Sequence, residues 1–173
     1  FNFMKDLEEP HYNQIFYVPE VEFNAYDGIA IGMKLSNRSM LNKPFSFTAT
    51  PMYSSNTGKF VGKATFFIDD NIRDEGKLYN IRYILRGSQF HYAPDATYTN
   101  LVPTIQFFFR DKNLRSNKNE FIQLRQVYIN REASPFITEN TENYNVFNAK
   151  YGNFQSEGTK HFSFSNDLQI SSK

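Results

Sequence analysis

Apolar and polar side chains alternate residue by residue along most of this chain, and this period of two limits the folds open to it. In Gly28–Ser36, Ile29, Ile31, Met33 and Leu35 share one face, and glycine, alanine, lysine and serine residues take the other. Successive side chains of a β-strand point to opposite faces. The segment therefore predicts a strand with one apolar side and one mostly polar side.

The same alternation recurs in eight further segments, which we interpret as strands. The clear ones are Phe45–Ser54, Tyr79–Arg86, Leu101–Arg110 and Phe162–Ile170, and the less regular ones are Ile15–Phe23, Phe60–Ile68, Phe121–Arg131 and Tyr144–Tyr151. The best helical candidate is Met4–Glu9, which Pro10 cuts short. We therefore predict an all-β fold of about nine strands in a single domain over residues 1–173.

The segments between these strands are rich in Asn, Asp, Ser, Gly and Lys, the residues that supply turn hydrogen bonds and positive φ. They are Ser36–Pro44, Ser54–Lys59, Asp69–Lys77, His91–Asn100, Asp111–Glu120, Glu132–Asn143 and Asn153–Lys160. Short connections of this kind join neighbouring antiparallel strands, so the order of the sheet is expected to be a meander.

Two architectures use such strands. A soluble β-sandwich or open barrel buries its apolar faces, whereas an outer-membrane barrel turns them toward lipid and points its polar faces into the lumen. Several segments match the length of a membrane strand, about 9–11 residues, better than the typical strand of about 5–6. Aromatic residues such as Tyr53, Phe60 and Phe90 stand near strand ends, as in a membrane-interface girdle, although the absence of Trp counts against one. The alternation alone leaves both architectures open.

Composition excludes several classes of function. There are 19 Lys and Arg and 18 Asp and Glu, and the net charge of +1 removes the positive field that favours a nucleic-acid partner. The lack of cysteine excludes disulfides, cysteine-bound metals and thiol catalysis. No apolar run approaches the about 20 residues of a membrane helix, and the start has no features of a signal peptide. A start on Phe1 suggests a piece of a longer protein.

Candidate metal ligands lack the spacing of a site. His11, His91 and His161 are scattered, and none has a His or Glu at i+3 or i+4, which favours loop and strand-end positions without a ligand role. The acidic run Asp69–Gly76 does not have the ligand spacing of an EF-hand and has Arg73 in its middle. A solvated hairpin loop, at most a weak calcium site, is the better interpretation. We therefore predict no metal and no cofactor.

Other charged groups do not predict a catalytic site either. The basic segment Arg110–Lys118 follows three Phe residues but is too weakly charged for nucleic acid, and a loop between strands explains it. Glu20 and Glu22 share a strand face about 7 Å apart; such pairs more often face a lumen or solvent than a substrate. Four bases lie on the polar faces of the predicted strands, namely Lys34, Lys63, Arg82 and Arg86. They could form a basic ladder along a lumen, or they could simply balance the charge of lumenal Glu residues. We prefer charge balance and name no catalytic residue.

Several strand-and-turn segments follow one another in an order typical of one family. They are Tyr26–Gly32, Lys43–Phe47, Pro51–Ser54, Gly76–Tyr83, Phe90–Pro94 and Leu114–Lys118. Together they resemble the β-barrel region that follows the peptidase domain in large membrane-associated gluzincin-type metallopeptidases of Bacteroidetes-type bacteria. The resemblance runs from about Tyr26 to Arg131 and rests on structural signatures rather than on catalytic motifs.

The resemblance implies a non-catalytic segment of a barrel in the outer membrane of a Gram-negative bacterium, which anchors an attached peptidase or forms a pore wall. The family's His-Glu-x-x-His zinc motif is absent from the sequence, so we predict that this chain is not itself an enzyme. The expected partners are outer-membrane lipid and the rest of the parent polypeptide. The alternatives are a soluble periplasmic or extracellular β-sandwich that binds a ligand or protein, and, more weakly, a β-rich hydrolase with dispersed carboxylates.

Overall fold

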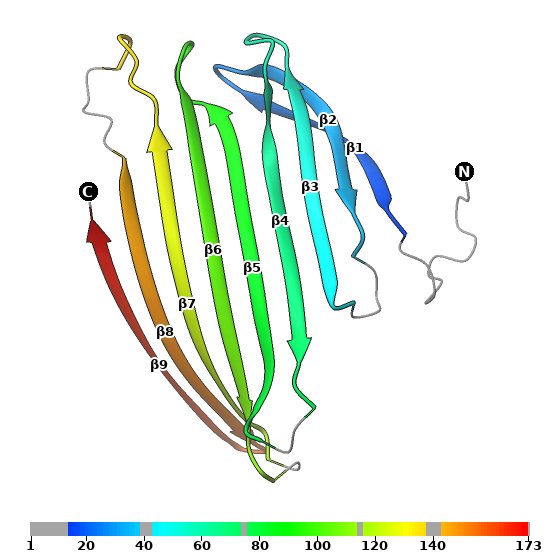
Figure 1. Ribbon diagram of the computed structural model, residues 1–173, viewed down its shortest axis with the longest axis vertical. Helices are drawn as coiled ribbons and strands as arrows, with labels where there is room; N and C mark the ends of the chain where they lie inside the picture. The colour runs from blue at the N-terminus through cyan, green and yellow to red at the C-terminus, as the bar shows by residue number, and fades with distance from the viewer. Residues whose placement is uncertain (1–13, 39–42, 74–75, 114–115, 138–142, 173) are drawn as a thin grey trace.

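The residues that the structure describes form β-strands and the connections between them. The computed structural model describes residues 14–38, 43–73, 76–113, 116–137 and 143–172, and these residues form nine strands and no helix (Figure 1). The strands are β1 (Phe16–Asn24), β2 (Gly28–Ser36), β3 (Phe45–Ser54), β4 (Phe60–Asn71), β5 (Leu78–His91), β6 (Thr97–Arg110), β7 (Lys118–Arg131), β8 (Tyr144–Glu157) and β9 (Lys160–Ser172). The part of the chain described here has no helix long and apolar enough to cross a membrane. The helical candidate Met4–Glu9 lies outside the described residues.

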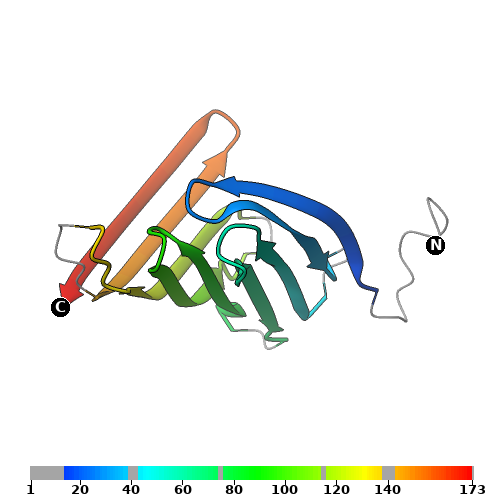
Figure 2. The same cartoon turned by 90° about the horizontal axis from the view of Figure 1, so that it is seen from above.

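All nine strands belong to one sheet, and each pairs antiparallel with the next along the chain, in the order β1 to β9. The predicted antiparallel meander of about nine strands is therefore confirmed. The sheet is not closed: β1 and β9 are its two edges, and they run in the same direction because the strand number is odd (Figure 1). Seen from above, the sheet curves around, with the β1–β2 hairpin turned in over β3 to β5 (Figure 2).

The strands extend further than the sequence predicts, because polar turn-forming residues also occupy the polar side of a strand. The predicted connector Asn153–Lys160 is wrong: β8 continues to Glu157, and only Gly158 and Thr159 separate it from β9. In the same way, β4 runs three residues beyond Ile68 to Asn71, and Thr97 to Asn100 belong to β6 rather than to a loop.

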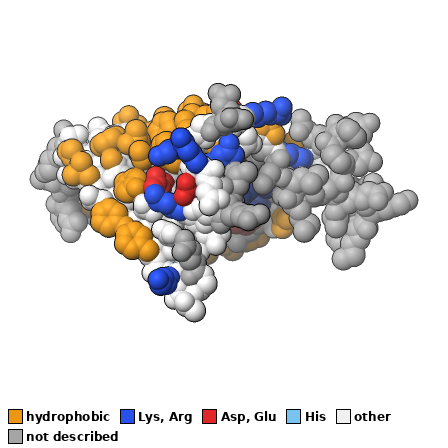
Figure 3. Space-filling model, turned by 90° about the horizontal axis from the view of Figure 1, so that it is seen from below, with side chains coloured by type: hydrophobic (Ala, Val, Ile, Leu, Met, Phe, Trp, Pro, Cys, Tyr) orange, Lys and Arg blue, Asp and Glu red, His pale blue; other side chains and the backbone are white. Residues whose placement is uncertain are grey.

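The register keeps most of the exposed large hydrophobic side chains on one side of the sheet and most charged ones on the other, although the second side also carries apolar residues such as Ile84, Phe108 and Phe121. On the first side, the apolar face, each strand exposes at least one large hydrophobic residue: Val21, Ile31, Tyr53, Phe66, Leu85, Leu101, Leu124, Phe147 and Leu168. The opposite side, the polar face, carries from β1 to β9 residues such as Glu22, Lys34, Thr50, Lys63, Arg86, Gln106, Arg125, Lys150 and Asp167. Viewed from below, charged side chains gather toward the middle and hydrophobic ones along the margin (Figure 3).

The inward turn of β1 and β2 depends on an irregular place in β3. Pro51 has no N–H to give to the β2–β3 ladder, and the pairing of these strands is interrupted between Gly32–Met52 and Leu35–Ala49. On its other side Pro51 faces Gly62, whose φ is +146° and whose missing Cβ would lie 2.1 Å from the Thr50 carbonyl oxygen. The sheet coils sharply here, and a small buried apolar cluster joins Ala30 of the curled hairpin to Met52 of β3 and Val61 of β4.

Toward the β9 edge of the sheet, Gly152 in β8 leaves space for an aromatic ring of β7. A Cβ at position 152 would lie 2.3 Å from ring carbon Cε1 of Phe121, and the same ring stacks on Phe154 with centroids 5.9 Å apart. We expect Gly152→Ala to lower the free energy of unfolding by about 1–3 kcal/mol, because the ring must move. Gly87→Ala is the control, since its Cβ would meet nothing closer than 3.5 Å. Urea titration of both variants measures the difference, and equal losses would contradict this role of Gly152.

Candidate functional site

The polar face of β1 to β5 carries two groups of paired charges. The Lys63 ammonium on β4 forms an ion pair with Glu22 on β1, and its Nζ lies 3.8 Å from Glu20 Oε1. The Arg82 guanidinium on β5 donates from Nε to Asp69 Oδ1 over 2.6 Å. Glu20 and Glu22, which the sequence places on one strand face, are thus joined by a lysine that stands between them.

These ion pairs do not account for all four bases that the sequence singles out. Lys63 and Arg82 have acidic partners, whereas Lys34 and Arg86 form no ion pair with any described residue. Charge balance, the interpretation preferred from the sequence, therefore describes the first two bases, and the last two are left with uncompensated charge.

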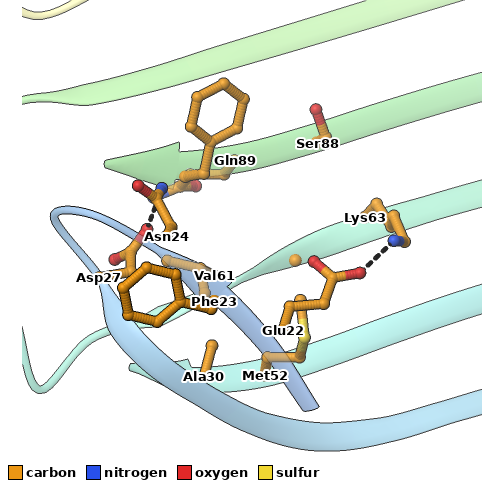
Figure 4. Close-up of a pocket in the computed structure, with 12 residues that line it drawn as sticks. Glu22, Phe23, Asn24, Asp27, Ala30, Met52, Val61, Lys63, Ser88 and Gln89 are labelled. Atoms are coloured by element: carbon orange, nitrogen blue, oxygen red, sulfur yellow. Dashed lines mark hydrogen bonds and ion pairs between the residues drawn. The ribbon is translucent and has the colours of Figure 1, made fainter. Parts of the chain in front are cut away.

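A cavity of about 300 Å³ lies between the curled hairpin and the strands beneath it (Figure 4). Its wall includes Glu22 and Asn24 of β1, Asp27 of the β1–β2 turn, Lys63 of β4 and Gln89 of β5, and its apolar part is the Ala30, Met52 and Val61 cluster. The Glu22 carboxylate points across it to Lys63 (Figure 4). Because its charged side chains are already engaged with one another or with His91, the cavity presents no free carboxylate pair of the kind that general acid–base catalysis uses.

The most deeply buried polar contact of the described residues, which we call the clasp, joins Asp27 to His91 at the end of β5. His91 Nδ1 lies 2.6 Å from Asp27 Oδ1, and the His91 backbone N–H donates to Asp27 Oδ2 over 2.9 Å. Asn24 Nδ2 donates to Asp27 Oδ2 over 3.0 Å and to the His91 carbonyl oxygen over 2.8 Å. The Ser54 hydroxyl donates to the Asp27 carbonyl oxygen over 2.6 Å. Side chains of Asp27 and His91 are 2% and 0% exposed, so these bonds are shielded from water.

The clasp holds the hairpin in its curled position, because it links two segments that are not neighbours in the sheet. Asp27 and His91 are 64 residues apart in the sequence, and three strands separate β1 from β5. The sequence treats His91 as a strand-end histidine and gives Asp27 no role. No local pattern connects them, since the contact forms only when the sheet coils.

The other candidate residues lie apart. His91 and His161 stand at opposite ends of the sheet, where β5 ends and β9 begins, and His11 lies outside the described residues. The described residues contain no group of three or more His, Asp or Glu side chains that could hold a metal ion. The acidic run was predicted as a hairpin loop, but Asp69 and Asp70 belong to β4; Asp74 and Glu75 are not described.

In the basic segment, Arg110 ends β6 and Lys118 begins β7, so these two bases flank a connection between strands as expected. Lys118 Nζ lies 2.5 Å from Glu120 Oε1, which compensates the charge of this base. Leu114 and Arg115 lie outside the described residues.

At the same end of the sheet as the clasp, Glu132 joins the segment after β7 to the start of β6. The Thr97 N–H donates to Glu132 Oε2 over 2.8 Å, and the Tyr92 hydroxyl donates to the Glu132 carbonyl oxygen. Hydrogen bonds from Thr97, first its N–H and then its hydroxyl, hold the pKa of the Glu132 carboxyl below its usual range.

We expect Glu132 to titrate below the about 4.3 of an ordinary glutamate. Since these bonds favour the charged form, the stability that the contact adds is complete above that value and is lost as the pH falls through the lowered pKa. A titration of the Glu132 carboxyl carbon by NMR measures the midpoint. The Thr97→Val variant, which keeps the N–H donor, should raise this pKa only in part. A wild-type midpoint at or above 4.3 would contradict the contact.

Comparison of the chain with models of protein families, with curated proteins and with solved structures gave no match.

Proposed function

We propose that this chain is a non-catalytic segment of an outer-membrane β-barrel, which anchors an attached metallopeptidase domain or forms part of a pore wall. The observation that carries the proposal is the apolar face, where large hydrophobic side chains from all nine strands are exposed together. A water-soluble monomer rarely exposes a continuous apolar surface larger than a few hundred Å². In a membrane barrel the same surface contacts lipid.

The strand lengths and the polar face support the same proposal. Five of the strands have 13 or 14 residues, β5 to β9, which is longer than the about 9–11 residues that a tilted membrane strand needs. Ion pairs and amide groups line the polar face, as expected for a wall that borders a water-filled lumen. The resemblance of Tyr26 to Arg131 to the barrel region of gluzincin-type metallopeptidases is compatible with both points.

The open edges also bear on the proposal. Every residue of β9 is exposed, and its alternation matches that of the paired strands, with Phe164 and Leu168 on the apolar face and Ser165 and Asp167 on the polar face. Lipid cannot satisfy the N–H and C=O groups of an open edge. We therefore propose that a further antiparallel strand pairs with β9 in the assembled barrel.

Expression with and without detergent tests the proposed function. We expect the chain to remain monodisperse only in detergent micelles or lipid vesicles, where an acyl environment covers the apolar face. A monodisperse, folded monomer in buffer without detergent would contradict the proposal and favour the soluble β-sandwich or open barrel.

A further inference from the structure

The polar face carries many more bases than acids. Eight bases lie on it, Lys34, Lys63, Arg82, Arg86, Arg110, Arg125, Arg131 and Lys150, and four acids, Glu20, Glu22, Asp69 and Asp167. This leaves a formal charge of about +4 on one side of a chain whose total is +1. The excess positive charge is therefore collected on one face and is hidden in the overall composition.

The four acids of this face are all engaged. Glu20 and Glu22 share Lys63, Asp69 accepts a hydrogen bond from Arg82, and Asp167 accepts one from the Asn148 amide. By contrast, the side chains of Lys34, Arg86, Arg125 and Lys150 form no hydrogen bond or ion pair with a described residue, and the Arg131 guanidinium lies over the Tyr98 and Tyr144 rings. Lys150 faces Asp167 directly across β8 and β9, so the charge without an acidic neighbour belongs chiefly to Lys34, Arg86 and Arg125.

Arg125 and Lys150 stand near one another on the polar face, and Arg86 lies further along the same face. Gln123 faces Lys150 across β7 and β8, and Arg125 faces Asn148. Arg125 and Lys150 are therefore diagonal neighbours, whose backbones lie about 7–8 Å apart. Arg86 lies on β5, with β6 between it and the strand of Arg125. The Arg125 Nε atom is buried and has no hydrogen-bond partner in the described part of the chain, so one donor of this guanidinium is unsatisfied.

We infer that Arg86, Arg125 and Lys150 form a binding surface for oxyanions that carry two or more negative charges. Guanidinium groups bind phosphate and carboxylate oxygens through several N–H donors, and lysine adds a mobile point charge. The inference rests on the proposed function, because a barrel wall encloses these charges and makes their field act on one lumen. It gives that wall a preference for anions over cations.

Binding of tripolyphosphate in an uncharged detergent at low salt tests this inference by calorimetry. We expect the triple variant Arg86→Gln, Arg125→Gln, Lys150→Gln to bind at least about tenfold more weakly. The matched control Lys59→Gln, Lys77→Gln, Lys112→Gln removes the same charge from exposed connections between strands and should change the affinity less than about threefold. The charge-conserving triple Arg86→Lys, Arg125→Lys, Lys150→Arg should retain binding, which separates loss of charge from loss of fold.

Absence of tripolyphosphate binding by the wild type, or an equal loss in both glutamine triples, would overturn the inference. Neither result bears on the membrane proposal, which depends on behaviour without detergent. Conversely, a chain that proves soluble in plain buffer contradicts the proposed function, and the same binding titration can still be carried out in that buffer.

Discussion

Replacing Leu85 with arginine is expected to destabilise the fold in lipid vesicles by about 2–4 kcal/mol, the cost of a base near the middle of the lipid-facing side of a barrel. Leu85 stands in the middle of β5 on the apolar face and is 42% exposed. Its neighbour Arg86 already places a guanidinium one residue away on the polar face, so the backbone itself accommodates arginine here. Only the direction of the side chain distinguishes the two positions.

Asn100→Arg on the neighbouring strand β6 is the matched control for this substitution. Asn100 faces Ser88 on the polar face, and the described residues give its side chain no hydrogen bond that the change would break. The control should shift the free energy of unfolding by no more than about 0.5 kcal/mol. Urea unfolding in vesicles measures both variants. If Leu85→Arg costs no more than Asn100→Arg, the apolar face does not contact lipid.

Removing the clasp is expected to have the second large effect. Asp27→Ala leaves the buried Nδ1 and backbone N–H of His91 without their acceptors, and each buried polar group left unpaired costs about 1–3 kcal/mol. We expect a loss of about 2–5 kcal/mol in the free energy of unfolding. Faster hydrogen exchange in β1 and β2 should accompany this loss, because the Asp27 side chain no longer ties the hairpin to the end of β5.

Two controls distinguish the effect of losing the clasp from a general destabilisation of the β1–β2 turn. Asp27→Asn keeps one oxygen to accept a hydrogen bond from His91 and should cost less than the alanine variant. Tyr26→Ala removes an exposed ring from the same turn without touching the clasp, and its effect should stay within about 0.5 kcal/mol. A loss for Tyr26→Ala as large as that for Asp27→Ala would contradict the role of the clasp.

The strands could be predicted from the sequence because alternation is a local property. Ile29 to Leu35 reveal their common face without knowledge of any partner, and the same holds for the other segments. Strand ends were less predictable: Asn153 and Gln155 resemble turn residues but continue β8, since the polar side of a strand accepts the same side chains. Whether such residues belong to a strand or to a turn depends on their backbone hydrogen bonds to the neighbouring strands.

The clasp and the unpaired bases could not be predicted, because they depend on contacts between distant segments. Asp27 contacts His91 only because the sheet coils at Pro51 and Gly62. The residues next to Asp27 and His91 in the sequence give no indication of this contact. Likewise, Lys63 and Arg86 look alike in the sequence. The three-dimensional arrangement gives one of them two glutamates and leaves the other without a partner.

Fluorescence quenching in lipid vesicles tests most directly whether the apolar face contacts lipid. The chain has no Trp, so a single introduced Trp reports on its position alone. Trp at Tyr83, Leu85 or Leu101 should be quenched by lipids brominated in the acyl chain and protected from acrylamide. Trp at Arg86, Ser88 or Asn100 should show the reverse, so that quenching alternates with a period of two. Equal quenching on both faces, or acrylamide quenching of all six positions, would contradict the membrane-barrel account.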